Sequence, residues 1–147
     1  MKSLFDPTAL SEIQQRLKEL TSESNRQWGK MTPAQMLNHC QAPLNIMLKR
    51  KDYGLKPMWL VSLLFKKSLY NDKPFKKNLP TAKSLKQTTD KDFNVEFSKL
   101  SELVEEVKAQ RETADWGAHP AFGKLTKEQW GKMQYKHLDH HLKQFGV

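Results

Sequence analysis

The spacing of apolar residues is helical almost throughout this chain, and this periodicity limits the possible folds more than any other feature. The clearest stripe steps by four and three residues through Phe93, Phe97, Leu100, Val104 and Val107. A second stripe passes through Leu10, Ile13, Leu17 and Leu20. No segment alternates apolar and polar residues between turn signals. The expected fold class is all-α: four long helices, one of them divided, in a single bundle.

Capping signals mark where these helices are expected to begin. Asp6-Pro7 fits a helix start, and Thr32-Pro33-Ala34-Gln35 and Thr126-Lys127-Glu128-Gln129 both match the capping-box pattern. Pro57 opens another candidate helix. The stretch from Lys66 to Asp90 has no periodicity, which predicts either a crossover between distant helices or a functional loop.

Length and composition exclude several classes of protein. A chain of 147 residues is expected to form one domain, residues 1–147. A single cysteine, Cys40, excludes an internal disulfide framework and a zinc site built from several cysteines. The longest apolar run, Met58 to Phe65, is far shorter than the roughly 20 residues of a membrane span. Because this run is so short, we expect no membrane partner. The N-terminus lacks an apolar signal core and the single cysteine fits a reducing compartment, so we expect a cytoplasmic protein.

The formal net charge of +9 is concentrated in one part of the chain. The segment from Lys49 to Lys91 contains twelve basic and three acidic residues, and the remainder is balanced. Such a segment could attract nucleic acid or another anionic ligand. It could equally be a solvated loop. No recognised nucleic-acid-binding motif accompanies it, so nucleic acid is the less favoured partner.

Three of the five histidines lie within five residues near the C-terminus. His137 and His141 continue the apolar stripe of the last helix, which includes Trp130, Met133 and Phe145. Residues four apart share a helical face, so both imidazoles are expected to point at one place. His140 falls on another face with Lys136 and Lys143, which we expect to be exposed, although a His137/His140 pair remains an alternative.

His39 is a third histidine in apolar surroundings, near Met36, Cys40 and Met47 on the second helix. Three imidazoles in one core are costly unless something satisfies their polar atoms. A divalent metal would do so, since neutral imidazole is its commonest ligand. The alternative is a set of histidines satisfied by hydrogen bonds. Pro43 cannot donate to the carbonyl of His39, which predicts a kink or a helix end there.

Two stretches of the sequence resemble an uncharacterised bacterial branch of the DinB/YfiT-like superfamily of metalloenzymes. One runs from Trp28-Gly29-Lys30-Met31-Thr32-Pro33 to His39-Cys40, and the other from His119-Pro120 through Trp130 to Tyr135–Val147. The resemblance implies a four-helix bundle with a long crossover connection. It also implies a divalent metal held by His39, His137 and His141. Superfamily members include S-transferases and isomerases that use low-molecular-weight thiols.

The predicted function is therefore that of a metal-dependent enzyme of transferase or hydrolase type. Three neutral ligands leave a coordination position open to water or a thiol. Histidine-only sites suit several metals, and we expect zinc or nickel. The alternatives are a nucleic-acid- or anion-binding helical module that uses the segment from Lys49 to Lys91, and a non-catalytic structural bundle. Trp59, Leu60 and Leu63 could supply the surface of a homodimer or could equally belong to the core.

No general base is evident among the remaining residues. Asp139 is two residues from each of His137 and His141 and is expected to point off their face. Asp115 and His119 precede the last helix and could line the mouth of a pocket, with loop solvation the alternative. Cys40 is expected to be buried packing and not a nucleophile.

Overall fold

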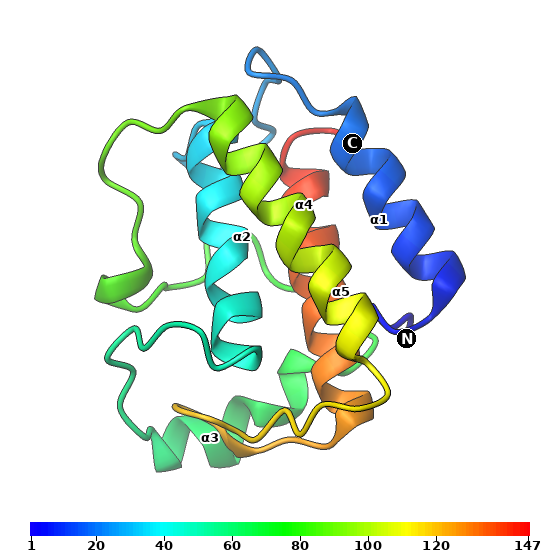
Figure 1. The fold of residues 1–147 in the computed structure, drawn as a ribbon. Helices are drawn as coiled ribbons and strands as arrows, with labels where there is room; N and C mark the ends of the chain where they lie inside the picture. Colours follow the sequence, from blue (N-terminus) through cyan, green and yellow to red (C-terminus); the bar gives the residue numbers. More distant parts are fainter.

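The computed structural model describes residues 1–147 as a mainly helical protein with one small sheet (Figure 1). The α-helices are α1 (Pro7–Glu19), α2 (Pro33–Met47), α3 (Trp59–Phe65), α4 (Phe93–Gln110) and α5 (Lys127–Gln144). Two short 3₁₀ helices, η1 (Lys66–Leu69) and η2 (Lys83–Leu85), follow α3. Strands β1 (Ala118–His119) and β2 (Gly123–Lys124) form an antiparallel pair before α5.

The expectation of an all-α four-helix bundle with a long crossover connection is wrong. The structure has five α-helices and a two-stranded antiparallel sheet, so it mixes α and β elements. Ala118 pairs with Lys124 and His119 with Gly123, whose φ of 70° suits the turn. Strands of two residues are too short to show apolar alternation, which is why the sequence pattern does not reveal them.

The predicted helix starts at Asp6, Thr32 and Thr126 are confirmed. The Asp6 carboxylate accepts from the backbone N–H of Thr8 at 2.9 Å. Thr32 and Thr126 each form a complete capping box, with Gln35 and Gln129 respectively. These reciprocal bonds satisfy N–H groups that the first turn of a helix leaves free. They fix the beginnings of α2 and α5, which are the two helices that carry the candidate site.

The core lies between the four longest helices, α1, α2, α4 and α5 (Figure 1). The predicted stripe of α1 is buried throughout, as are Leu100, Val104 and Val107 of α4. One buried charge joins α2 to α4: the Glu96 carboxylate accepts from Asn38 at 2.7 Å and from Gln41 at 2.6 Å. These bonds satisfy a carboxylate that would otherwise be costly to bury.

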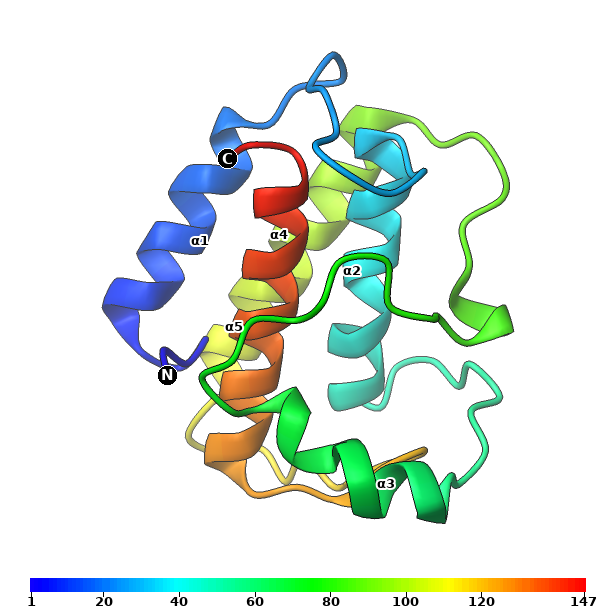
Figure 2. The same cartoon turned by 180° about the vertical axis from the view of Figure 1, so that it is seen from behind.

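The connection from α3 to α4 passes across α5 and α2 (Figure 2). It is fastened by Lys136 of α5, whose ammonium donates to the carbonyl oxygens of Ser68 and Asn71 at 2.6 and 3.1 Å. Lys136 was expected to be exposed, but it is buried, and burial lowers its pKa. The connection covers this side of α5 and supplies the carbonyl oxygens that satisfy the ammonium.

Helix α3 begins two residues after Pro57 and contributes no buried residue to the core. Its large apolar side chains are exposed, although their spacing resembles that of a core helix. None of the helices combines the length and the apolar character needed to cross a membrane.

Candidate metal centre

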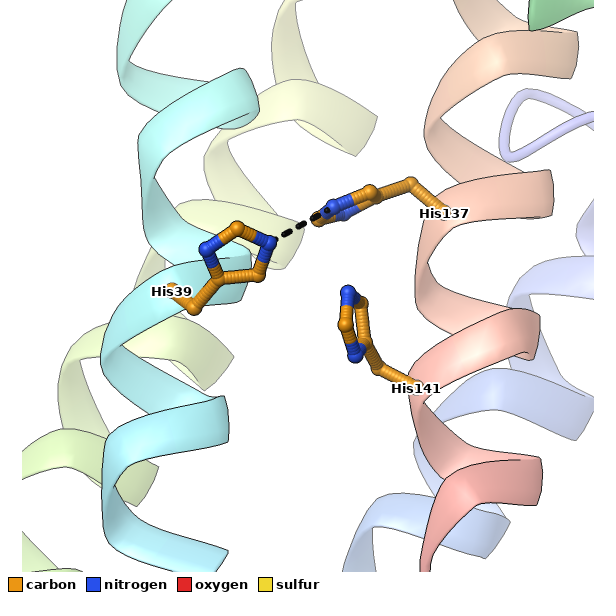
Figure 3. Close-up of side chains that lie close together, drawn as sticks. All are labelled: His39, His137 and His141. Carbon is orange, nitrogen blue, oxygen red and sulfur yellow. Dashed lines mark hydrogen bonds between the residues drawn. The ribbon is translucent and has the colours of Figure 1, made fainter. Parts of the chain in front are cut away.

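Three imidazole rings from two helices converge on one space. His39 extends from α2, and His137 and His141 extend from α5, one turn apart (Figure 3). The Nε2 atoms of His39 and His137 are 3.2 Å apart, and one nitrogen of each ring lies within 4.8 Å of the other two. The structure thus brings together the three histidines that the sequence pattern selects.

The period of α5 and one hydrogen bond between α2 and α5 produce this arrangement. The stripe of α5 that contains His141 is buried, because Trp130, Met133 and Phe145 of the same stripe pack in the core. On the other side, α2 continues through Pro43 without a break. The Gln134 amide of α5 donates to the Pro43 carbonyl at 3.0 Å, which ties α2 to α5 one turn from His39.

The tautomer of His141 follows from a chain of hydrogen bonds. The Trp28 carbonyl can only accept, so the Gln144 group that contacts it at 2.8 Å is the NH₂. The Oε1 atom of Gln144 therefore faces His141, whose Nδ1 lies 2.8 Å away and must carry the proton. The lone pair of His141 is then on Nε2.

Glycine at position 29 allows this chain of bonds to form. Its φ of 79° lies in the left-handed region, where a side chain would be strained. A Cβ added at Gly29 would also overlap the Gln144 amide nitrogen. The Trp28-Gly29 pair of the sequence motif therefore brings a backbone carbonyl against the residue that orients His141.

His39 is oriented by the connection between α3 and α4. Its Nδ1 lies 3.3 Å from the carbonyl oxygen of Leu85 in η2, so Nδ1 donates and the lone pair is on Nε2. His137 differs, because its Nδ1 is buried without a hydrogen-bond partner. The Nε2 atom of His137 lies within hydrogen-bond distance of the Nε2 lone pair of His39, and the Nε2 lone pair of His141 belongs to the same cluster. Buried lone pairs of this kind are unfavourable unless a cation or a proton donor satisfies them.

Burial keeps all three imidazoles neutral at neutral pH. Burial lowers the pKa of His141 to about 3, with a smaller contribution from His39. Burial, followed by the neighbouring imidazoles, lowers the pKa of His137 well below its ordinary value. Burial also lowers the pKa of His39, against a small opposing effect of the Leu85 carbonyl. Metal binding requires the neutral imidazole, so the ligands need not lose protons first.

The three residues fit a divalent ion in chemistry and in spacing. An ion held tetrahedrally by imidazole nitrogens, with bonds of 2.0–2.1 Å, keeps those nitrogens about 3.3 Å apart. The nitrogens of His39 and His137 already have nearly this separation. The third ligand atom, within 4.8 Å, needs to approach by at most about 1.5 Å. The Nδ1 atom of His39 bonds to the Leu85 carbonyl, and the Nδ1 atom of His141 bonds to Gln144. Histidines that bind a metal through one ring nitrogen usually make such a hydrogen bond through the other.

The remaining histidines lie outside this cluster. His140 is half-buried between the rings of Trp28 and Phe75, with centroid distances of 5.5 and 5.8 Å. His119 is buried in β1 and its Nδ1 accepts from the Ala121 N–H at 3.1 Å. That bond holds the turn between β1 and β2, so His119 has a structural role and does not line the cluster.

The other residues considered from the sequence are also accounted for. The Cys40 thiol is buried 3.5 Å from the Met36 sulfur, and burial raises its pKa, as expected of packing. Asp139 forms ion pairs with Arg16 and Lys143, both at 2.8 Å, away from the cluster. Asp115 is exposed and 3.8 Å from the Lys49 ammonium.

Sequence reasoning missed two groups that orient the ligands. Gln144 lies three residues after His141, on the same side of the helix, and that spacing could have indicated it. The Leu85 carbonyl gives no sequence signal, because any residue supplies a carbonyl and only the path of the connection brings this one to His39.

Fold and site together define a mainly helical protein with a buried cluster of three histidines. The chain belongs to DUF1569, a protein family of unknown function, which matches residues 2–146. Comparison with curated proteins and with solved structures finds no match.

Proposed function

We propose that this protein is a metal-dependent enzyme whose divalent ion is held by His39, His137 and His141. The observation that carries this proposal is the convergence of three neutral imidazoles, two of which have their outer nitrogens held by Gln144 and Leu85. The resemblance to the DinB/YfiT-like superfamily rests on the same three histidines, and membership of that superfamily is part of the proposal.

Zinc or nickel is the proposed metal, because both accept an all-imidazole ligand set. Such an ion would supply a Lewis acid with at least one coordination position for water or a thiol. The protein contributes the fixed tautomers of His39 and His141. Trp28 and Phe75 lie against His140, the neighbour of His141 on α5, and Leu85 of the connection between α3 and α4 contacts His39 on α2.

The proposed reactions are transfer to or from a low-molecular-weight thiol and hydrolysis. The test is a screen of thiol-transfer and ester-hydrolysis substrates with zinc-loaded, nickel-loaded and metal-free protein. We expect turnover only with metal present and only while all three histidines are intact. Equal rates for metal-loaded and metal-free protein across the screen would contradict an enzymatic role, even if the metal binds.

Replacing Gln144 by methionine is expected to weaken metal binding about 10- to 100-fold, as for other partners of metal-binding histidines. The variant removes the acceptor that keeps the proton of His141 on Nδ1, so Nε2 is no longer held ready to bind. The measurement is the zinc dissociation constant from competition with a chromophoric chelator.

Gln134→Met is the matched control for that variant. Gln134 is also a buried glutamine on α5 that donates to a backbone carbonyl, but that carbonyl belongs to Pro43 and the amide has no bond to a histidine. We expect Gln134→Met to lower stability and to leave zinc affinity nearly unchanged. Equal losses of affinity in both variants would show a general effect of packing and not an orienting role for Gln144.

A further inference from the structure

Helix α3 presents an apolar surface that no part of the chain covers. Trp59, Leu63 and Leu64 are 72%, 77% and 70% exposed. Met58, Leu60 and Phe65 are also exposed, and we call these six residues the α3 surface. Single exposed apolar residues are ordinary, but six within one eight-residue run indicate an interaction site.

The orientation of α3 is the reverse of that of an ordinary surface helix. Its one polar side chain, Ser62, faces the protein and donates to the Phe122 carbonyl at 3.1 Å. The backbone N–H of Met58 donates to the Ala121 carbonyl at 3.2 Å. These bonds fasten the helix to the turn between β1 and β2, at the periphery of the molecule (Figures 1 and 2). The apolar side chains are therefore directed outward by the fold.

Basic residues flank the α3 surface in the sequence on both sides. Lys56 precedes it, and Lys66 and Lys67 follow it directly. No acidic residue occurs between Asp52 and Asp72, and Asp72 is paired with the N-terminal ammonium at 2.7 Å. A second copy joined by two-fold symmetry would bring like charges together around the contact. A partner with negative charge and an apolar interior complements both features of the surface.

We propose that α3 docks on a membrane surface that contains anionic lipid. The helix would lie in the interface, with its leucines among the upper acyl chains and the lysines against the headgroups. Trp59 and Phe65 occupy the two ends of the helix, and an aromatic ring such as that of Trp59 suits this boundary. The expectation of no membrane partner rested on the shortness of the run from Met58 to Phe65. A helix that lies in the membrane interface does not need an apolar run long enough to span the bilayer.

The test is co-sedimentation of the full-length protein with vesicles of phosphatidylcholine alone or mixed with phosphatidylglycerol. We expect binding to the mixed vesicles that weakens as salt is raised. Leu63→Ser with Leu64→Ser should reduce the partition coefficient by at least about tenfold. Lys56→Gln with Lys67→Gln should reduce it about 25-fold, since each lysine near such a surface contributes about fivefold.

These substitutions alter exposed side chains, so the fold is expected to tolerate them. The matched control is Leu79→Ser with Val95→Ser, which removes two exposed apolar side chains outside α3 and should leave binding unchanged. Absence of binding to the mixed vesicles would overturn the proposal. So would binding that the control pair reduces as much as the α3 pair does. A wild-type dimer that Leu63→Ser dissociates, without vesicle binding, would assign the surface to a second copy.

Discussion

Replacing His39 or His141 by alanine is expected to raise the dissociation constant for zinc at least about 100-fold. Loss of a ligand must exceed the 10- to 100-fold effect of losing a hydrogen-bond partner of a ligand. His39→Ala leaves two imidazoles on α5, and His141→Ala leaves one imidazole on each of α2 and α5. Either variant gives the ion only two protein ligands. The measurement is metal content by elemental mass spectrometry of untagged protein, followed by titration of the apo forms.

His140→Ala is the control, because His140 is adjacent to His141 on the same helix and lies outside the cluster. It is expected to retain near-stoichiometric metal. Loss of metal in His140→Ala, with metal retained in His141→Ala, would select the alternative pair His137/His140. A wild-type protein that stays metal-free after exposure to zinc and nickel would contradict the metal site altogether.

The metal-free protein is expected to lose about 4 kcal/mol of unfolding free energy between pH 7 and pH 5 through two histidines. The pKa of His141 is about 3 and that of His119 about 4 in the folded chain, against about 6.5 when unfolded. The unfolded chain therefore binds more protons in this range. Each contribution is complete above the unfolded pKa and is lost as the pH falls toward the folded pKa. Burial of His39 and His137 acts in the same direction.

Urea unfolding at pH 7 and pH 5 measures this dependence. His141→Ala and His119→Ala should each reduce the difference between the two pH values by about 2 kcal/mol. Lys132→Gln serves as a control, since it alters an exposed ion pair with Glu128 and should leave the difference nearly unchanged. A difference that survives both histidine substitutions would show that other groups govern acid unfolding.

Much of the helical structure could be predicted because the signals that determine it are local. The Thr32 and Thr126 capping boxes involve residues three apart, so short segments of sequence determine where α2 and α5 begin. The choice of His137 and His141 over His140 follows in the same way, from the period of one helix. Lys136 shows the limit of that reasoning, because its helical face is covered by a connection that arrives from elsewhere.

The fold class was predicted wrongly for a related reason. The pairing of β1 with β2 depends on two residues from each strand, which is too little sequence for a periodic signal. Helix α3 has a core-like pattern, and nothing local distinguishes an apolar helix that is buried from one that faces outward. That distinction is made by contacts, here the bond from Ser62 to the Phe122 carbonyl.

By itself, the sequence determined the positions of the long helices and the three histidines that could meet, because periodicity and capping act over a few residues. Only the tertiary structure decided that His39 lies 3.2 Å from His137 and that Gln144 and the Leu85 carbonyl hold the outer nitrogens. It also decided that α3 is exposed. The physical reason is that these features join segments far apart in the chain, and their spacing is set by how whole elements pack.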